Sequence, residues 1–418
     1  MSWWGRRAIG AAQPVPQDEE EAADGQFRSV ALVVGATGIV GSSLVGILPL
    51  PDTPGGQWKV YALSRRPPPP WAASADAVTH LQVDLADSSA VAEALAPLTD
   101  ITHVFYAALA PPHVVEARNR RANRAMLRNV LSVVVPNCAA LAHVCLQTGT
   151  KHYTGPPEAI AARRIVGGVI HGIVSDGGAS SSSIKQPYTE DMPRLGWRNF
   201  YYDQEDVLFD AVSSQAPKRG GGISWSVHRP NLILGFSPRS AMNIVCSLCV
   251  YAAICRKEGV PLRWPGSRGA WEGFSAASDA DLVAEQQIWA AGDPVAKNQA
   301  FNCSNGDIFR WEQLWPILAD RFGLEWVGYR GKKKRVRLAF AMPRKAAVWA
   351  EIVEENHLVA TQLHEVANWW FVDGLFYDKW EFLDSMNKSK EHGFLGFRNT
   401  AKSFNTWIDK MKACRIVP

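Results

Sequence analysis

Short apolar runs alternate with longer amphipathic stretches from residue 29 to residue 147. The runs have the length and β-branched content of buried parallel strands, and they cover residues 29–34, 58–63, 80–83, 102–107 and 141–146. The intervening stretches predict helices over residues 39–48, 87–98 and 114–134. Strands that alternate with helices at this spacing are typical of βαβ units. The pattern therefore predicts an α/β fold built on a doubly wound parallel Rossmann sheet.

The pattern changes after residue 235. Aromatic residues and Pro-Gly turns become frequent, and helices predicted over residues 241–255, 278–291 and 311–322 mix with short strands. We expect residues 236–418 to form a smaller C-terminal α+β region that covers the substrate and is interleaved with the sheet. Residues 28–235 are expected to form the sheet domain, with a serine-rich loop insertion at 160–184. Residues 1–27 are predicted to be a disordered tail.

Composition narrows the class of protein. The chain has 418 residues, a net charge of +4, 47% hydrophobic residues and 20% charged residues, which is typical of a globular protein and excludes a collagen-like or coiled-coil chain. Seven thinly spread cysteines favour reduced thiols in a cytoplasmic protein. The apolar stretch 241–255 is too short to span a bilayer, and the N-terminal region has no apolar core of a signal peptide. We therefore expect no membrane partner.

Two further patterns are interpreted as structural. The basic run 332–337 lacks aromatic stacking residues, which favours a solvated loop over a nucleic-acid site. Cys246 and Cys249 form a CxxC pair in an apolar stretch without a second pair, which favours core packing over metal binding. We expect no metal and no nucleic-acid partner.

A glycine-rich loop follows the first predicted strand and opens the first helix. In Gly35-Ala36-Thr37-Gly38-Ile39-Val40-Gly41, the first glycine makes the turn, the second admits a pyrophosphate and the third lets the helix pack against the strand. The helix N-terminus adds free N–H donors and partial positive charge. The loop therefore predicts dinucleotide binding.

The end of the second predicted strand distinguishes the two nicotinamide dinucleotides. NAD enzymes place an acid there, on the ribose 2′-hydroxyl. This chain has Ser64-Arg65-Arg66 instead, and two guanidinium groups can bind a 2′-phosphate. The cofactor is therefore predicted to be NADPH, with Asp84 at the end of the third strand meeting the adenine edge.

The usual catalytic motif of short-chain dehydrogenases, YxxxK, is missing where it is expected. Tyr201 is followed four residues later by Glu205, and Tyr202 by Asp206. The nearest suitable lysine is Lys151, just beyond the fifth strand, where ligands sit in an open α/β sheet.

These residues carry a resemblance to a known family. Leu-Gln-Thr-Gly-Thr-Lys-His-Tyr at 146–153, Asn-Phe-Tyr-Tyr at 199–202, Trp-Ser-Val-His-Arg-Pro at 225–230 and the glycine loop with Ser64-Arg65-Arg66 resemble the plant progesterone 5β-reductase / iridoid synthase family of extended short-chain dehydrogenases. Further matches lie at 189–195, 275–291, 301–307 and 384–397, so the resemblance covers nearly all of residues 28–418.

The resemblance implies an NADPH-dependent enone 1,4-reductase that reduces the C=C bond of steroid enones such as progesterone, or of smaller enones and enals. Tyr201 would hydrogen-bond the carbonyl oxygen and Lys151 would favour the charged state and hold the ribose. The implied cofactor contacts are Gly35, Thr37, Gly38, Ile39, Gly41, Arg65, Arg66, Asp84, Leu85, Ala108, Gln147, Tyr201, Ile233, Ser240, Ala241 and Met242. Leu109 and Tyr201 would line the substrate pocket.

Departures from the family keep two alternatives open. The family has Thr-Trp where this chain has Ala108-Leu109, which predicts a wider pocket, and the 160–184 insertion separates Lys151 from Tyr201. One alternative is a catalytically impaired NADP-binding scaffold. The other is a nucleotide-sugar-type extended short-chain dehydrogenase, which the missing YxxxK disfavours. The physiological substrate, product stereochemistry and a homodimeric state are left open.

Overall fold

The computed structural model describes residues 27–71, 76–113, 115–154, 164–166, 169–171, 183–184, 186–214, 222–331, 335–377 and 381–418. The tail expected at residues 1–27 lies outside the described residues except for Phe27. The chain divides into two compact units. Unit 1 comprises Met1–Pro230, Asp281–Cys303 and Asp384–Gly396, and unit 2 comprises Asn231–Ala280, Ser304–Leu383 and Phe397–Pro418.

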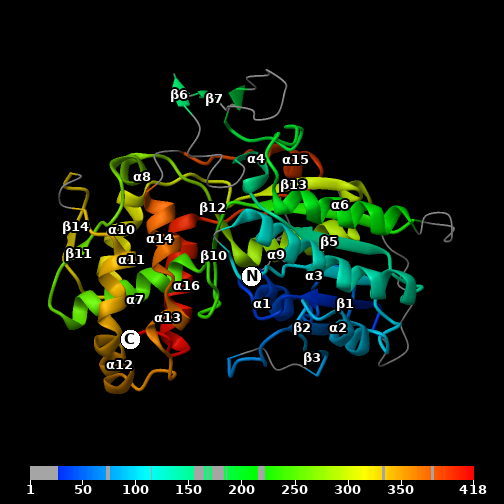
Figure 1. Ribbon diagram of the computed structural model, residues 1–418, viewed down its shortest axis with the longest axis horizontal. Coiled ribbons are helices and arrows are strands. Elements are labelled where there is room, and N and C mark those ends of the chain that lie inside the picture. Colours follow the sequence, from blue (N-terminus) through cyan, green and yellow to red (C-terminus); the bar gives the residue numbers. More distant parts are fainter. Residues whose placement is uncertain are drawn as a thin grey trace. The chain divides into compact units, whose positions relative to one another are not determined.

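Unit 1 is built on a seven-stranded parallel sheet (Figure 1). The strand order is β13-β9-β5-β4-β1-β2-β3, and each neighbouring pair is parallel. The strands are β1 (Ser29–Val34), β2 (Trp58–Ser64), β3 (Val78–Gln82), β4 (His103–Tyr106), β5 (His143–Gln147), β9 (Ser224–Pro230) and β13 (Gln299–Cys303). The order reverses direction at β1, as in doubly wound sheets. The predicted fold class is confirmed.

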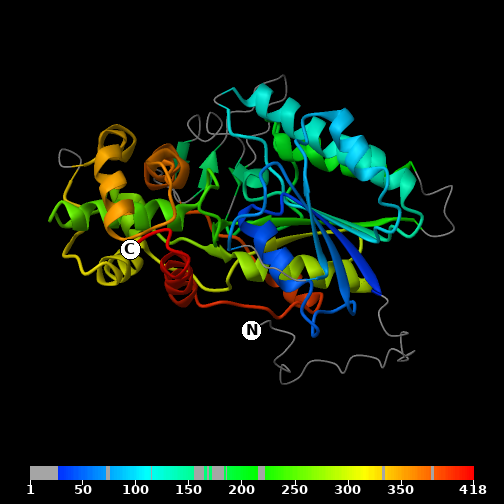
Figure 2. The same cartoon turned by 90° about the horizontal axis from the view of Figure 1, so that it is seen from below.

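Helices cover both faces of this sheet (Figure 2). They are α1 (Ile39–Ile47), α2 (Ser88–Leu95), α3 (Glu116–Asn137), α4 (Lys151–Thr154), α6 (Phe200–Ser213), α9 (Ala280–Gly292) and α15 (Asn387–Glu391), with the 3-10 turn η3 (Pro294–Ala296). Alternate residues of β1, namely Val30, Leu32 and Val34, share a hydrophobic core with α2, α3 and α6. Successive side chains of a strand point to opposite faces. The remaining face is covered by α1 and α9.

A chain of polar side chains crosses the sheet where an apolar core is usual. His143 on β5 contacts Ser224 and Ser226 of β9 at 2.8 and 2.9 Å. Ser226 Oγ lies 2.9 Å from His228 Nε2, and His228 Nδ1 lies 2.8 Å from Gln286 Oε1 on α9. Each group is buried and hydrogen-bonded, so the polar core stays satisfied. These polar side chains explain why the sequence pattern did not identify β9 as a strand.

Unit 2 is mainly helical. Its strands β10 (Leu232–Leu234) and β12 (Ala277–Asp279) form one parallel pair, and β11 (Leu262–Arg263) and β14 (Trp326–Val327) form another. Its helices are α7 (Ile244–Lys257), α8 (Arg268–Glu272), α10 (Trp311–Arg321), α11 (Leu338–Ala341), η5 (Met342–Lys345), α12 (Ala346–Glu355), α13 (Leu363–Val366), α14 (Trp369–Tyr377) and α16 (Thr400–Ala413). Trp264 packs against Trp271, Trp315 and Phe376 with ring centroids 4.2–5.0 Å apart. Large buried aromatic side chains such as these contribute much of the apolar area buried in a core, here that of unit 2.

Several element boundaries differ from the sequence pattern. The helix predicted from residue 87 begins at Ser88, because the Asp87 side chain accepts hydrogen bonds from the N–H groups of Ser89 and Ala90 and so caps it. The helix predicted from residue 241 begins at Ile244, because Asn243 caps it in the same way. The 160–184 segment, predicted to be a loop, contains an antiparallel sheet of β6 (Arg164–Val166), β7 (Val169–His171) and β8 (Ser183–Ile184). Its other residues lie outside the described ones.

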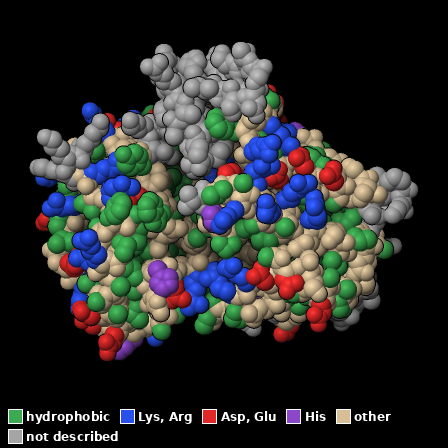
Figure 3. Space-filling view, in the orientation of Figure 1, with side chains coloured by type: hydrophobic (Ala, Val, Ile, Leu, Met, Phe, Trp, Pro, Cys, Tyr) green, Lys and Arg blue, Asp and Glu red, His purple; other side chains and the backbone are tan. Residues whose placement is uncertain are grey.

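Three general features bear on the sequence predictions. Each of the seven cysteines is a free thiol, and Cys246 and Cys249 are buried in α7. Over the described residues, the structure contains no helix long and apolar enough to cross a bilayer and no cluster of three metal-ligating side chains. Lysines 332–334 of the basic run lie outside the described residues. On the face drawn in Figure 3, basic and acidic side chains are interspersed.

Candidate functional site

The glycine loop has the geometry that its sequence predicts. Gly35 has a φ of +91°, the left-handed region that favours glycine. A Cβ on Gly35 would lie 2.8 Å from Ala108 N, and one on Gly41 would lie 2.1 Å from Gly35 O. The N–H of Gly38 donates to Gly35 O at 2.8 Å, which closes the turn before α1. A side chain on Gly41 would force the helix away from the end of β1, and one on Gly35 would clash with the segment after β4.

The start of α1 is suited to an anion. The first turn of α1 consists of Ile39, Val40 and Gly41, all uncharged, and half-buried Thr37 and Gly38 precede it. The first N–H groups of a helix have no partner within the helix, and the helix dipole places partial positive charge there. The turn follows the carboxyl end of β1, beside the reversal in strand order, where dinucleotides bind in this class of sheet.

The neighbouring strand ends bring the other predicted cofactor residues to the same edge. Arg65 is exposed and Arg66 half-buried directly after β2, and Ser64 Oγ donates to Arg66 O at 2.6 Å. Asp84 follows β3, where its Oδ1 accepts the N–H of Ala86 at 3.0 Å and shapes the turn. Because β1, β2 and β3 are adjacent and parallel, these ends lie on the same side of the sheet.

Three more predicted contacts of unit 1 lie after β3, after β4 and at the end of β5. Leu85 is buried, and its carbonyl accepts a hydrogen bond from Asn129 on α3 at 2.9 Å. Gln147 Oε1 accepts a hydrogen bond from Gln287 on α9 at 3.2 Å. Ala108 is half-buried, and Leu109 beside it is 37% exposed. Leu109 therefore offers an apolar surface after β4.

Four predicted cofactor residues belong to unit 2. Ile233 lies in β10, and Ser240, Ala241 and Met242 form the turn before α7. The Ala241 carbonyl accepts a hydrogen bond from Asn368 at 2.6 Å. That these four residues contact a cofactor is a prediction from the sequence.

Both members of the predicted catalytic pair, Lys151 and Tyr201, contact the ring of Phe200, the first residue of α6. Lys151 Nζ lies 5.2 Å from the centroid of the Phe200 ring, and the Tyr201 ring centroid lies 4.3 Å from it. Asn199 caps α6 by accepting the Tyr201 N–H at 3.0 Å, and its Nδ2 donates to the Lys151 carbonyl at 2.7 Å. One capping residue therefore anchors both members of the pair.

The turn between β5 and α4 packs against the Tyr201 hydroxyl. A Cβ on Gly149 would lie 3.1 Å from Tyr201 Oη. The turn is held to β9 by hydrogen bonds from Thr148 N to His228 O at 2.7 Å and from Thr150 N to Pro230 O at 3.2 Å. Burial, with a smaller contribution from the Glu116 carboxylate, raises the pKa of Tyr201 above its usual value. In this state the hydroxyl keeps its proton and can donate it in a hydrogen bond.

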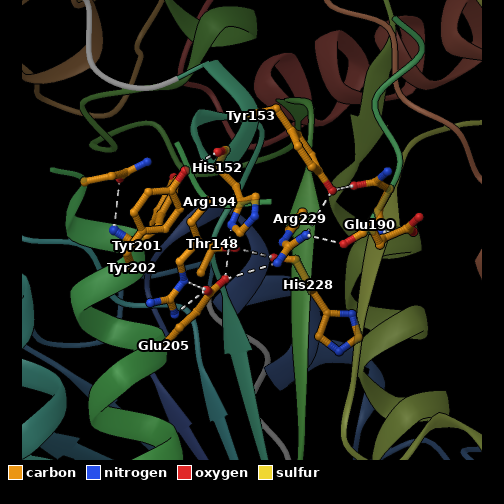
Figure 4. Close-up of polar contacts among 12 residues, drawn as sticks. Thr148, His152, Tyr153, Glu190, Arg194, Tyr201, Tyr202, Glu205, His228 and Arg229 are labelled. Atoms are coloured by element: carbon orange, nitrogen blue, oxygen red, sulfur yellow. Dashed lines mark hydrogen bonds and ion pairs between the residues drawn. The ribbon is translucent and has the colours of Figure 1, made fainter. Parts of the chain in front are cut away.

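A buried ionic cluster is formed by residues of α4, α6 and β9 (Figure 4). Glu205 occupies the position four residues after Tyr201, where YxxxK would place lysine. Its Oε2 accepts hydrogen bonds from Arg194 at 2.8 and 3.2 Å, and its Oε1 accepts one from Arg229 at 3.3 Å. His152 Nδ1 lies 3.3 Å from Oε1, within ion-pair distance but without the geometry of a hydrogen bond. Glu205 is only 2% exposed.

The cluster continues toward β13. Arg229 Nη1 donates to Tyr153 Oη at 3.1 Å, and Tyr153 Oη donates to Asn302 Oδ1 at 2.6 Å. Glu190 Oε1 accepts the Asn302 N–H at 2.6 Å. Sequence reasoning did not assign Arg229 or Asn302, although an arginine at the end of a strand is a signal that could have identified the first.

A cavity of about 360 Å³ opens beside this cluster. Met192, Phe209, Trp225 and Ala300 form its apolar lining, and Arg194 and Glu205 contribute polar groups. Phe209 and Trp225 pack at 4.6 Å between ring centroids. The cavity leaves Arg194 partly accessible, in agreement with its 37% side-chain exposure.

Comparisons with known proteins identify the family of the chain. The model of the PRISE-like Rossmann-fold domain matches residues 31–418. A 3-oxo-Δ4,5-steroid 5β-reductase of Arabidopsis thaliana is 52% identical, and an (S)-8-oxocitronellyl enol synthase of Nepeta cataria is 51% identical, each over the full length of both chains. An epimerase structure from Methanothermobacter thermautotrophicus superposes with a TM-score of 0.60 over 93% of each chain at 12% identity, which shows the shared fold alone. The resemblance predicted from sequence is confirmed, and the chain belongs to the PRISE-like Rossmann-fold family.

Proposed function

We propose that this protein reduces the C=C bond of α,β-unsaturated carbonyl compounds with NADPH. Lys151 and Tyr201 act as the catalytic pair, at the carboxyl end of β5. The observation that carries the proposal is that both side chains contact the Phe200 ring while Gly149 packs against the Tyr201 hydroxyl. The two named relatives act on a steroid enone and an oxocitronellyl compound, by their names, and are about half identical to this chain.

The residues present fit a nicotinamide dinucleotide. The close approach of Gly41 to Gly35 O leaves no room for a side chain between the strand and the helix, so the N-terminus of α1 stays near the strand end. Arg65 and Arg66 would hold the 2′-phosphate of NADPH through paired guanidinium hydrogen bonds. Asp84, Leu85, Ala108 and Gln147 would border the adenosine and the nicotinamide ribose. When bound, the cofactor supplies the hydride.

Tyr201 would stabilise the negative charge that develops on the substrate carbonyl oxygen. Its raised pKa keeps the hydroxyl protonated, so the group donates to that oxygen as the charge grows. A donor of this kind is worth about 3–4 kcal/mol of transition-state stabilisation. The Lys151 ammonium adds positive charge beside Tyr201, which favours the developing oxyanion and the ribose hydroxyls.

We infer that unit 2 covers the substrate, with Ile233, Ser240, Ala241 and Met242 approaching the cofactor. Exposed Leu109 replaces the tryptophan that the family resemblance leads us to expect, which leaves space for a bulky apolar enone. The seven free thiols fit a reducing compartment, so we place the protein in the cytoplasm.

The proposal is tested by following NADPH oxidation at 340 nm with 2-cyclohexen-1-one, progesterone and a linear enal, with NADH in parallel. We expect oxidation that depends on the added enone and prefers NADPH. NADPH binding without turnover on all three compounds would overturn the reductase proposal and favour a cofactor-binding scaffold. Equal rates with NADH would overturn the assignment of Arg65 and Arg66.

A further inference from the structure

Glu205 lies one helical turn after Tyr201 on α6. Residues four apart on a helix share a face, so the two side chains project in the same direction. Glu205 is buried, whereas Asp206 beside it is exposed. An acid at the position where related enzymes carry the catalytic lysine therefore faces the interior of unit 1, toward the elements that carry Lys151.

The carboxylate of Glu205 is charged in this environment. Burial acts to raise the pKa of Glu205, but the contacts with His152, Arg229 and Arg194 outweigh it and lower the pKa below its usual value. The two guanidinium groups bind different oxygens of the carboxylate. A buried ion pair is costly to break because the surviving charge is left without a partner. The carboxylate is therefore a fixed anchor.

This anchor reaches both residues that follow Lys151. His152 Nδ1 lies 3.3 Å from Glu205 Oε1, and burial lowers the pKa of His152 although the nearby Glu205 carboxylate acts to raise it. Arg229 bridges the same Oε1 to the hydroxyl of Tyr153, with hydrogen bonds of 3.3 and 3.1 Å. Tyr202, from the adjoining turn of α6, donates to the His152 carbonyl at 2.5 Å. The short helix α4 is thus attached to α6 at consecutive residues (Figure 4).

We propose that Glu205 is a positioning residue for the catalytic pair: its carboxylate, through His152 and through Arg229 and Tyr153, holds α4 so that Lys151 stays beside Tyr201. This inference rests on the proposed roles of Lys151 and Tyr201. A four-residue helix has too few internal hydrogen bonds to hold its own orientation. Glu205, the acid at the lysine position of the motif, therefore helps to hold Lys151 of α4 in place.

The test compares Glu205→Gln with Asp203→Asn. Asp203 lies on the same helix and forms an ion pair with Arg120 of α3 at 2.8 and 2.9 Å, so its substitution removes a partly buried α6 ion pair away from α4. We expect Glu205→Gln to lower kcat for enone reduction at least about tenfold, since small misplacements of a reacting group are expensive. Asp203→Asn should change kcat by less than about twofold. The NADPH dissociation constant, measured by fluorescence, should change little in either variant.

A second arm reads the position of α4 without turnover. The N–H groups of His152 and Tyr153 donate to Gly149 O and Thr150 O, so hydrogen exchange of this segment reports its order. Exchange there should accelerate at least about tenfold in Glu205→Gln and stay unchanged in Asp203→Asn. Equal exchange and equal kcat loss in the two variants would overturn the proposal. An inactive wild-type protein that still shows the exchange difference would overturn the reductase proposal alone.

His152 keeps the inference testable if Glu205→Gln does not fold. His152→Leu leaves the carboxylate and both arginines in place but removes the ring contact. His152→Asn retains a polar group near the position of Nδ1, which lies 3.3 Å from Glu205 Oε1. We expect the leucine variant to lose kcat and the asparagine variant to recover most of it. Full activity in a folded His152→Leu protein, with unchanged exchange of α4, would contradict the proposal.

Discussion

Gly149 and Tyr201 lie in contact: a Cβ on Gly149 would be 3.1 Å from Tyr201 Oη and 3.2 Å from the carbonyl oxygen of Pro230. The turn after β5 therefore packs directly against the hydroxyl proposed to act on the substrate. These distances are shorter than most contacts that a Cβ makes in proteins, so a neighbouring atom would have to move by a few tenths of an ångström. The Pro230 carbonyl belongs to a strand of the sheet, so Tyr201 is the group that would yield.

Gly149→Ala should therefore impair catalysis more than folding. We expect kcat to fall about tenfold, because the displaced Tyr201 hydroxyl is no longer aligned to donate a hydrogen bond to the developing oxyanion. The matched control is Gly46→Ala in α1, where an added Cβ meets nothing within 4 Å. That variant should keep full activity and gain about 0.5–1 kcal/mol in the free energy of unfolding. Steady-state kinetics and denaturant titration of both variants check this, and an unimpaired Gly149→Ala would argue against the placement of Tyr201.

Tyr201→Phe should abolish most turnover while leaving cofactor binding intact. Loss of one donor to a developing oxyanion lowers kcat by about 10²–10³. Tyr202→Phe is the informative comparison, since that hydroxyl donates to the His152 carbonyl and its ring is buried. We expect a smaller loss in Tyr202→Phe. If the two variants reverse this order in single-turnover measurements, the second tyrosine is the donor.

Replacing both Arg65 and Arg66 with alanine should weaken NADPH selectively. Each guanidinium–phosphate hydrogen bond to a charged group is worth about 1.5–3 kcal/mol, so KM for NADPH should rise at least about tenfold. KM for NADH should stay nearly constant because NADH lacks the 2′-phosphate. Arg121→Ala, an exposed position on α3, is the control for lost positive charge. A parallel loss for both cofactors would point to a structural role instead.

Acid should destabilise the fold through the buried histidines of the sheet. Burial lowers the pKa of His228 to about 4 from its usual value of 6.5. Between these values the unfolded chain binds a proton that the folded chain does not, so stability falls as pH falls. From pH 7 to pH 5, His228 alone accounts for about 2 kcal/mol of the lost free energy of unfolding.

The dependence is measured by denaturant titration at pH 7 and pH 5 for the wild type, His228→Gln and His364→Gln. His364 is exposed and lies outside the buried polar side chains of the sheet, so its substitution is the control for losing a histidine elsewhere in the chain. His228→Gln lowers stability at both pH values but should show the smaller difference between them. The same slope in all three proteins would show that His228 does not contribute.

Much of the site could be predicted from local pattern. Gly35 and Gly38 follow an apolar run and precede the helix that contains Gly41, and the close approaches at Gly35 and Gly41 require glycine at those two positions. Arg65 and Arg66 could be identified because they occupy the end of the second strand, where NAD enzymes carry an acid. By contrast, β9 and β13 were missed, since residues such as Ser226, His228 and Asn302 look unsuited to a core strand until their partners are known.

The sequence by itself determined the class of fold and the dinucleotide loop, because these depend on residue types at short spacings, whereas the candidate pair Lys151 and Tyr201 came from the resemblance to the family. Only the tertiary structure decided how Glu205 is used. Its partners Arg194, Arg229 and His152 come from three other segments of the chain, and burial with two guanidinium groups converts an isolated acid into a fixed charge. Such long-range electrostatic compensation has no signature in a local pattern, since it depends on which distant side chains the fold brings within ion-pair distance.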